Sequence, residues 1–529
     1  MKILTAAEMQ RIDRLTSEKS GVPSLTLMEN AGRGVVEYLE ERFPPLSSQR
    51  ILILCGRGNN GGDGMVVARL LRERGLKPRV VLFSDPEKVK GDAAVNLERL
   101  AATGSPEIAA DLTAWRSLKP QLEGSTLLID ALLGTGLSKP LEGFFLELVH
   151  DVNTGFPGAQ VVAVDLPSGV SADSGGVPGE SVRAHGSVTF TAPKLAHVFP
   201  PASERAGEWQ VKAIGTPREV LERDPALMLN LTCPEELEWM VRPRKAGAHK
   251  GNFGHVLILA GSIGKTGAAA MAGLAALRAG AGLVTIATAK SALPIIAGLG
   301  LEFMTEPLPE TETGTISLRA FEHGRLDSLV EGKSVLAIGP GIGTVIETAE
   351  LVRTAVNRYD MPLVVDADGL NAFAHCMSVF RSAGGYAHPA VLTPHPGEMS
   401  RLCGQPTADI QKHRVETARE FAERYKVHLV LKGAQSLSAS PDGQVWVNPT
   451  GNPGMATGGT GDVLTGLIAG LLAQHAGRAP IEVVAGAVYL HGLAGDVAAR
   501  EYGEAAMIAG DVIEAIPEAL ADLAERRVA

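Results

Sequence analysis

The residues best suited to chemistry stand in a glycine-rich run at positions 458–462, which reads Gly-Gly-Thr-Gly-Asp and precedes an apolar helical pattern. Glycine N–H groups at the start of a helix can cradle an anion, and Asp462 in the first turn can act as a base toward a ligand held there. The alternative is an aspartate that only caps its helix. Because a glycine-rich loop this long is poor for stability unless it binds something, the run predicts a phosphate-binding loop with a proton-transfer group.

A second polar, glycine-rich run lies at positions 56–64, directly after an apolar segment that ends at Cys55. Its glycine spacing matches the dinucleotide-binding fingerprint, Gly-x-Gly-x-x-Gly. Glycines alone are equally compatible with a tight strand-to-helix turn. Asn59, Asn60 and Asp63 favour a site for a cation or a polar ligand, because a hydride-transferring enzyme does not need these side chains.

Two further carboxylates in this half of the chain, Asp130 and Asp165, end apolar strand patterns. A glycine turn at 134–136 follows the first, and Ser168 follows the second. Open parallel sheets bind ligands at the carboxyl ends of their strands, so we expect these loops and the 56–64 run to converge. A single such aspartate is more often a helix cap or a turn residue; three loops together favour a site.

The elements that must position these residues follow from the alternation of apolar runs and helical patterns. Runs at 50–55, 79–83, 126–130 and 160–165 predict a parallel sheet covered on both faces, in a Rossmann-like, three-layer α/β domain. A second α/β series begins near residue 254. Its apolar runs lie at 255–259, 282–286, 334–338, 362–366 and 427–431, and helical patterns at 462–474 and 481–500 close the chain.

The pattern weakens between about residues 216 and 252, where four prolines and the basic stretch 242–245 occur. We therefore expect an N-terminal domain at 1–215, a linker region at 216–234 and a C-terminal domain at 235–529.

Bulk composition fits a folded enzyme of two domains. The chain has 529 residues, 45% hydrophobic and 20% charged, and a net charge of -10, which gives no support for binding nucleic acid or an anionic membrane. Four scattered cysteines lack metal-ligand spacing and indicate a reducing compartment. The N-terminus lacks a signal-peptide pattern, and the apolar stretch 267–289 is interrupted by Arg278, so we expect a cytoplasmic protein with a buried helix and strand there.

The N-terminal runs resemble the NAD(P)H-hydrate epimerase family over residues 1–215. In that family the residues matching Asn60, Asp130 and Ser168 hold a potassium ion, and a carboxylate at Asp165 can transfer a proton at the hydroxyl-bearing carbon of the hydrated ring. The resemblance implies substrate contacts from Asn59, Asn60, Gly61, Gly62, Asp63, Gly134, Thr135, Gly136, Leu137, Ser138, Lys139, Pro140 and Asp165. Lys194 is compatible with the same pocket or with an ordinary surface position, and it stays outside the catalytic set.

Polar loops also follow the strand patterns of the C-terminal half, at 339–343, 366–369, 393–398 and 432–436. His395 lies between two prolines in a stiff turn, where it can bond a ligand, although a lone histidine is usually structural. The run at 260–266 invites a P-loop interpretation but fails, because the first glycine would have to fall at Leu259.

Together with the 458–462 run, these loops resemble the ribokinase-like fold, and specifically the ADP-dependent NAD(P)H-hydrate dehydratase family, over most of residues 235–525. The resemblance implies a C-terminal ribokinase-like α/β domain with catalytic Asp462 and ADP as co-substrate, which Mg²⁺ can accompany. Nucleotide contacts (ADP or AMP) carry over to Lys432, Gly433, Ala434, Gln435, Ser436 and Gly461. Substrate contacts carry over to Ala268, Gly341, His395 and Asp462.

The two resemblances predict repair of NADH and NADPH hydrates: epimerisation of the R and S forms, then ADP-dependent dehydration of the S form. A homo-oligomer is expected. Two alternatives stay open at this point. One is a ribokinase-like small-molecule kinase fused to a nucleotide-binding domain, and the other is a non-catalytic nucleotide sensor.

Overall fold

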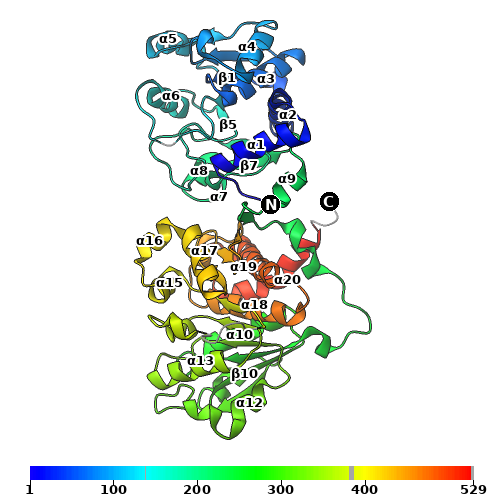
Figure 1. Ribbon diagram of the computed structural model, residues 1–529, viewed down its shortest axis with the longest axis vertical. Coiled ribbons are helices and arrows are strands. Elements are labelled where there is room, and N and C mark those ends of the chain that lie inside the picture. The colour runs from blue at the N-terminus through cyan, green and yellow to red at the C-terminus, as the bar shows by residue number, and fades with distance from the viewer. Residues whose placement is uncertain (138, 381–386, 526–529) are drawn as a thin grey trace. The chain divides into compact units, whose positions relative to one another are not determined.

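The computed structural model describes residues 1–137, 139–380 and 387–525, and its ribbon is drawn in Figure 1. The chain forms two compact units, Met1–Leu227 and Met228–Ala529. The division falls inside the segment 216–234, which was expected to be a linker but contains a helix and a strand that belong to the two units. Helix α9 (Arg218–Glu222) packs against the first helix of unit 1, and strand β8 (Leu229–Leu231) joins the sheet of unit 2.

Unit 1 is built on a sheet in which every neighbouring pair of strands is parallel. The strand order is β3-β2-β1-β4-β5-β6-β7, the doubly wound order of Rossmann-like folds, which confirms the predicted layout. The strands are β1 (Ile51–Cys55), β2 (Arg79–Leu82), β3 (Glu107–Ile108), β4 (Leu127–Ala131), β5 (Gln160–Val164), β6 (Gly186–Phe190) and β7 (Glu208–Lys212).

Helices cover both faces of this sheet. Ile51 and Ile53 of β1 point to a core shared with α2, α3 and α4, whereas Leu52 and Leu54 point to a second core with α5 and α6. This alternation within one fully buried strand is why the sequence shows a continuous apolar run. The helices are α1 (Ala6–Ser20), α2 (Ser24–Arg42), α3 (Asn59–Glu73), α4 (Asp92–Ala101), α5 (Leu112–Leu118), α6 (Gly143–Thr154), α7 (Leu195–Val198), α8 (Ala202–Ala206) and α9.

Unit 2 has a larger, mixed sheet in the order β11-β10-β9-β12-β13-β14-β15-β16-β17-β8. Neighbours are parallel from β11 to β15, β16 is antiparallel to both of its neighbours, and β8 runs parallel to β17. The strands besides β8 are β9 (His255–Leu259), β10 (Leu283–Ala289), β11 (Met304–Leu308), β12 (Val335–Ile338), β13 (Leu363–Val365), β14 (Ala390–Leu392), β15 (His428–Leu431), β16 (Leu437–Ala439) and β17 (Val445–Val447).

The helices of unit 2 include the two long apolar ones predicted near the C-terminus, but these do not close the chain, because α20 follows them. They are α10 (Thr266–Arg278), α11 (Leu293–Ala297), α12 (Arg325–Val330), α13 (Ile346–Arg358), α14 (Asp368–Asn371), α15 (Pro396–Cys403), α16 (Thr407–Lys412), α17 (Arg414–Tyr425), α18 (Thr460–Gln474), α19 (Pro480–Tyr502) and α20 (Ala509–Glu525). Pro517 lies inside α20, and because proline usually ends a helix, the sequence did not predict this one. Helix α19 is apolar and long enough to cross a membrane, but 78% of its most apolar window is buried in unit 2, as in a core helix.

In each sheet the winding direction reverses beside one strand, between β1 and β4 in unit 1 and between β9 and β12 in unit 2. Ligands of open α/β sheets bind at the carboxyl ends of strands around such a point. In unit 2, α18 reaches this point by packing closely on α10. A Cβ at Gly466 would lie 2.1 Å from the Ala272 carbonyl oxygen, so only glycine permits this approach.

Two candidate active sites at the carboxyl ends of the sheets

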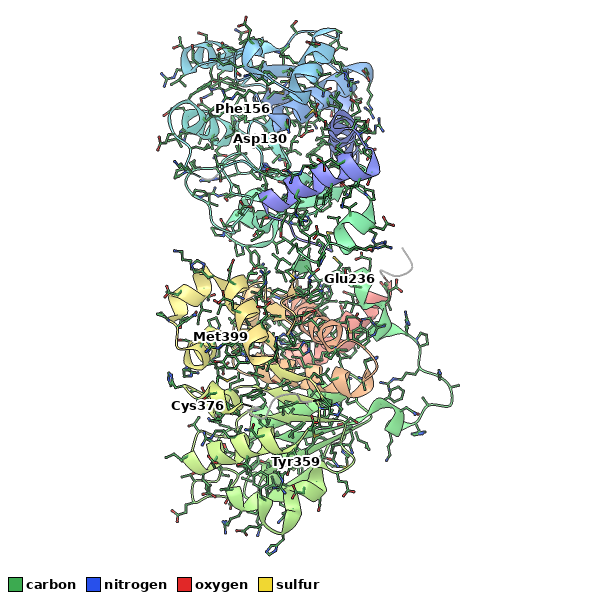
Figure 2. All side chains as sticks on the ribbon, viewed as in Figure 1. Asp130, Phe156, Glu236, Tyr359, Cys376 and Met399 are labelled. Atoms are coloured by element: carbon green, nitrogen blue, oxygen red, sulfur yellow. The ribbon has the colours of Figure 1, made fainter. Side chains whose placement is uncertain are left out.

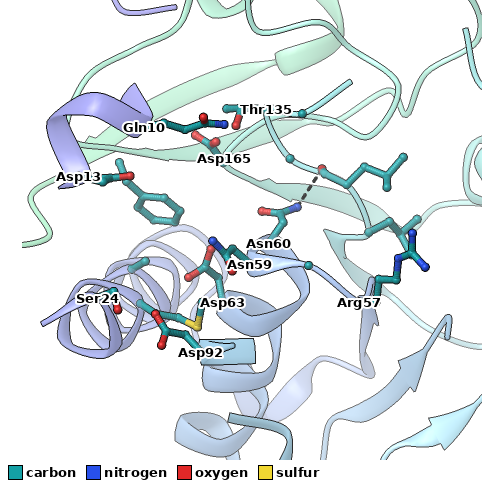
Figure 3. Close-up of a pocket in the computed structure, with 18 of the residues that line it drawn as sticks. Gln10, Asp13, Ser24, Arg57, Asn59, Asn60, Asp63, Asp92, Thr135 and Asp165 are labelled. Carbon is teal, nitrogen blue, oxygen red and sulfur yellow. Dashed lines mark hydrogen bonds between the residues drawn. The ribbon is translucent and has the colours of Figure 1, made fainter. Parts of the chain in front are cut away.

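Unit 1 contains a cavity of about 830 Å³ at the carboxyl ends of its strands. Its walls come from α1 and α2, the start of α3 and the loops after β1, β4 and β5 (Figure 3). The cavity is therefore where the three predicted loops converge. Predicted substrate residues that line it are Asn59, Asn60, Asp63, Gly134, Thr135, Gly136 and Asp165.

Other predicted substrate residues lie away from the cavity wall. Gly61 faces the turn before α3, and Gly62 packs against Met28. Leu137 packs on the core shared with α5 and α6, while Lys139 and Pro140 are exposed. Ser138 lies outside the described residues.

The turn between β1 and α3 leaves no room for a side chain at Gly61. A Cβ there would lie 1.8 Å from the Gly56 carbonyl oxygen, so Gly61→Ala should destabilise unit 1 by about 3 kcal/mol through overpacking. Gly58→Ala is the matched control, because Gly58 has φ -94° and its Cβ would meet nothing within 4 Å. Chemical denaturation compares the two variants. Equal stabilities would contradict the close packing of this turn.

Asp130 and Ser168 are joined in a buried network inside unit 1; Asp130 is labelled in Figure 2. Ser168 donates its hydroxyl to Asp130 Oδ1 at 2.6 Å and its backbone N–H to Oδ2 at 2.8 Å. Burial raises the pKa of Asp130, and these hydrogen bonds oppose the rise. Asn60 Nδ2 donates to the Leu133 carbonyl oxygen at 2.9 Å, but Asn60 Oδ1 is buried and has no hydrogen-bond partner among the residues that the structure describes. The three residues predicted to hold a cation thus belong to one oxygen-rich cluster around the β4 loop.

Asp165 forms an ion pair with Lys194, whose Nζ lies 2.6 Å from Asp165 Oδ1. Thr189 donates a hydroxyl to the same oxygen at 2.8 Å. Burial acts to raise the pKa of Asp165, but the Lys194 ammonium, with His197 and the Thr189 hydroxyl, outweighs burial and the pKa is lowered. Lys194 is fully buried, so the surface position that the sequence left open is wrong. Asp165 is therefore an ionised carboxylate held in a fixed orientation at the cavity.

The main chain at Asp165 adopts a left-handed conformation, with φ +63°. Such a conformation costs a residue with a side chain roughly 1–3 kcal/mol and clusters at functional sites. Thr191, just after β6, has φ +66°. The strands that carry the ion pair thus end in strained backbone that the surrounding contacts must hold.

Two more carboxyl groups, Asp13 of α1 and Asp63 of α3, line the same cavity (Figure 3). Burial raises the pKa of Asp13 to about 6. Burial also raises the pKa of Asp63 well above its ordinary value, and the charges of Asp165 and Asp13 add to that rise. Carboxyl groups whose environments move their pKa values apart can serve as acid and base in one site. The cavity offers an ionised base at Asp165 and a proton-holding carboxyl at Asp63.

In unit 2 the predicted nucleotide-binding lysine is held by carboxylates. Lys432 Nζ lies 2.8 Å from Asp366 Oδ1 and 3.8 Å from Glu398 Oε2. Thr465 of α18 donates its hydroxyl to Asp366 Oδ2 at 2.8 Å. A Cβ at Gly461 would lie 3.2 Å from Lys432 Nζ, so the ammonium faces the glycine-rich start of α18. This arrangement places a cation beside a helix N-terminus, which suits a phosphate.

Asp462 lies in the first turn of α18, among these charges. Burial raises its pKa to about 7; the Asp366 carboxylate adds to the rise, and Lys432 opposes it. A carboxyl group with a pKa near the working pH is suited to moving a proton in either direction.

The remaining predicted residues of unit 2 form two groups. His395 caps α15 by accepting the Gly397 N–H, and its Nε2 lies 3.5 Å from Glu398 Oε1, which links it to the Lys432 cluster. Ala268 and Gly341 lie side by side, since a Cβ at Gly341 would be 3.0 Å from Ala268 Cβ.

The loop that carries Gly433, Ala434, Gln435 and Ser436 follows Lys432 directly. Gly433 and Gln435 have positive φ angles, +136° and +46°, and Ser436 donates its hydroxyl to the Gly433 carbonyl oxygen at 3.0 Å. The loop is thus a strained turn that begins at the lysine.

Sequence reasoning missed Asp13, Thr189 and Thr465. It left Lys194 open, and it named the loops that contain Asp366 and Glu398 without giving these two carboxylates a role. Lys194 follows β6, a strand that was not recognised, so its place near the carboxyl end of a parallel strand could not be used to favour the pocket position. That strand reads Gly-Ser-Val-Thr-Phe, and its buried polar side chains interrupt the apolar run. Asp13 carries no such signal, because it lies on an amphipathic helix outside the sheet.

Two α/β units, each with ionisable groups and glycine-rich loops at the carboxyl edge of its sheet, define a two-site α/β enzyme. The family described as NAD(P)H-hydrate dehydratase matches residues 256–518, and the family described as YjeF-related protein N-terminus matches residues 24–196. The solved ADP/ATP-dependent NAD(P)H-hydrate dehydratase from Bacillus subtilis, co-crystallised with ATP and Mg²⁺, is 33% identical, with 56% of this chain and 100% of that chain covered and a TM-score of 0.48.

Curated relatives match along nearly the whole chain. The bifunctional NAD(P)H-hydrate repair enzyme of Moorella thermoacetica is 44% identical over 533 residues, which covers 99% of this chain and 98% of the relative. The enzyme of the same name from Escherichia coli K12 is 32% identical over 514 residues, with 97% and 92% covered. The chain belongs to the family of bifunctional NAD(P)H-hydrate repair enzymes.

Proposed function

We propose that this chain repairs hydrated NADH and NADPH in two steps. Unit 1 interconverts the R and S hydrates, and unit 2 removes water from the S form in an ADP-dependent reaction. The observation that carries the proposal is the similarity over 99% of the chain to a bifunctional repair enzyme. The two separate sites support it, because an epimerase on the same chain can supply the one epimer that a dehydratase accepts.

In unit 1, Asp165 is the group proposed to move the proton. Its lowered pKa keeps it ionised at neutral pH, so it can accept a proton from one epimer. Return of that proton to the substrate then forms the other epimer. Lys194 and Thr189 both bind Oδ1, which fixes the carboxylate plane. Asp63 supplies a second, proton-holding carboxyl on another wall of the cavity.

The cluster of Asn60, Asp130 and Ser168 fits a potassium ion. Hard cations take amide, carboxylate and hydroxyl oxygens as ligands, and the buried Asn60 Oδ1 has no partner within the described residues. A bound potassium ion would supply positive charge beside the Asp130 carboxylate and order the loops that follow β1, β4 and β5.

Potassium should therefore stabilise unit 1. Replacing NaCl by KCl at equal ionic strength should raise the Tm of the chain, because a ligand at 100 times its Kd adds about 2.7 kcal/mol to the folded state. Asn60→Ala should remove this response. Asn59→Ala is the matched control, since the exposed Asn59 side chain is outside the oxygen cluster. If Asn60→Ala keeps the rise in Tm that KCl gives, Asn60 is not a potassium ligand.

In unit 2, the hydroxyl of the hydrated ring must be protonated or phosphorylated before it can leave. Lys432 and the N–H groups at the start of α18 are proposed to hold the phosphates of ADP, while Asp462 moves the proton. Within residues 1–137, 139–380 and 387–525 there is no group of three carboxylate, histidine or cysteine side chains placed to hold a metal. Mg²⁺ would therefore arrive with the nucleotide phosphates.

Freshly hydrated NADH, incubated with the chain with and without ADP, tests the proposal. We expect the absorbance of intact NADH to return only with ADP. A phosphorylated alcohol formed from ATP would instead identify a small-molecule kinase, and nucleotide binding without turnover would identify a sensor. Either result overturns the repair function.

The four cysteines are free of disulfides, which supports a reducing, cytoplasmic compartment. A homo-oligomer is also proposed, and sedimentation velocity measures it directly.

A further inference from the structure

A buried histidine links the two main-chain segments that carry the Asp165–Lys194 ion pair. His197 of α7 is 2% exposed. Its Nδ1 accepts the backbone N–H of Lys194 at 3.0 Å, and its Nε2 lies 2.9 Å from the backbone carbonyl oxygen of Asp165. One ring therefore contacts the backbone at both ends of the pair.

These contacts fix the tautomer of His197. A backbone N–H can only donate, so Nδ1 carries no proton, and Nε2 must carry it and donate to the Asp165 carbonyl oxygen. Burial lowers the pKa of His197 to about 4, and the Lys194 ammonium adds to the lowering. The ring thus stays neutral in this one tautomer across the neutral pH range.

His197 binds the main chain at a residue with a strained conformation. Asp165 has φ +63°, a conformation that non-glycine residues rarely hold without surrounding contacts. The hydrogen bond from His197 engages the carbonyl of this residue, next to the side chain that lines the cavity. Trp209 packs against the histidine, with ring centroids 5.7 Å apart, and helps to hold the imidazole in place.

The hydrogen bonds of the Asp165 side chain show which of its two carboxylate oxygens is left for a ligand. Lys194 and Thr189 both bind Asp165 Oδ1. Within the described part of the chain, Oδ2 accepts none of the hydrogen bonds of this cluster, and the side chain is 14% exposed toward the cavity. Oδ2 is therefore the oxygen that can reach a ligand, and its direction depends on the backbone that His197 holds.

We propose that His197 is a positioning residue for the reaction of unit 1, which orients the Asp165 carboxylate by bonding the Asp165 carbonyl oxygen and the Lys194 N–H through one neutral imidazole. The inference rests on the proposed epimerase function. His197 does not touch the substrate; it acts through Asp165.

Two substitutions separate the two hydrogen bonds. His197→Asn keeps an acceptor near the position of Nδ1 and loses the donor to Asp165, whereas His197→Gln places an N–H donor near the position of Nε2. We expect His197→Asn to lower kcat for epimerisation about 10–100-fold with little change in KM, as is typical when a group that orients an active side chain is removed. His197→Gln should retain most of the wild-type rate.

His185→Asn is the matched control. His185 Nδ1 accepts the Val161 N–H at 3.0 Å, the same kind of bond, at the opposite end of β5 from Asp165. It should epimerise at the wild-type rate. Dehydration by unit 2 in the same preparations, with Tm values, reports whether each variant is folded.

The pH profile supplies a readout that folding alone does not move. Loosening the ion pair lets burial raise the pKa of Asp165, so the acidic limb of the epimerisation profile should move to higher pH in His197→Asn and stay in place in His197→Gln. Equal rates in all variants, or equal losses in His197→Asn and His197→Gln, overturn the positioning role. A wild-type chain that does not equilibrate the R and S hydrates overturns the epimerase function instead, and that measurement comes first.

Discussion

Asp462→Asn should reduce ADP-dependent dehydration by about 10²–10⁴-fold while epimerisation continues at the wild-type rate. The amide has nearly the shape of the carboxyl but cannot move a proton at the start of α18. The assay follows the return of NADH absorbance from purified S hydrate, so that the epimerase step is not needed. Retained dehydration would remove Asp462 from the mechanism.

Unfolding cannot account for the expected loss. The pKa of Asp462 is raised from 3.8 to about 7, so the folded state binds its proton more tightly than the unfolded chain does. Such a group favours folding below its unfolded pKa, and that contribution is lost as pH rises through about 7. Asparagine has no charge to bury, so the variant should gain stability relative to wild type as pH rises from about 5 to 8.

The wild-type pH profile then assigns the role of Asp462. Dehydration should change slope near pH 7, the value to which burial moves this carboxyl. A rate that rises through this pH makes the ionised group a base, and a rate that falls makes the protonated group an acid. A profile without a slope change between about pH 6 and 8 contradicts a titrating Asp462.

The fold was predictable from the sequence wherever a strand is apolar on both faces. The runs of β1, β4 and β5 are uninterrupted, and each strand begins and ends within about a residue of its run. Strand β6 was missed because Ser187 and Thr189 interrupt it, although both are buried. Ser187 donates its hydroxyl to the Ala206 carbonyl oxygen at 2.7 Å, a bond that only the tertiary structure provides.

The candidate sites were predictable where a residue follows a recognised strand. Asp130, Asp165 and the Lys432 loop were found in this way. Their partners were not, because Lys194 lies 29 residues after Asp165, and Thr465 lies 99 residues after Asp366. Local patterns carry no information on which distant side chain satisfies a buried charge, so the ion pairs that tune these sites needed the structure.

Lys194→Met shows the largest expected effect on stability. Methionine fills most of the space of the lysine but leaves the Asp165 carboxylate, 14% exposed, without its cation. Breaking a buried pair on one side costs about 3–5 kcal/mol, and the variant should unfold at correspondingly lower denaturant in a unit 1 transition. Epimerisation should fall by at least about 10²-fold, because the base loses its orientation and the cation that keeps it ionised.

The loss should depend on pH in a defined direction. In the wild type, the pKa of Asp165 lies below 3.8, so the ion pair contributes its stability above that pH and loses it as pH falls through the folded pKa. Without Lys194, burial raises the pKa of Asp165, and the carboxyl can fold neutral in mild acid. Lys194→Met should therefore be less destabilised at about pH 5 than at pH 8.

The double variant Asp165→Asn with Lys194→Met separates charge from packing. Replacing both members of a buried pair by neutral residues of similar size is often close to neutral for stability, so the double variant should recover most of the free energy of unfolding that Lys194→Met loses. It should recover no epimerisation, because the proton-transfer group is absent. The outcome against this interpretation is additivity, in which the losses in free energy of unfolding of Asp165→Asn and Lys194→Met sum to the loss of the double variant. The ion pair would then not stabilise unit 1, and the buried lysine would serve packing alone.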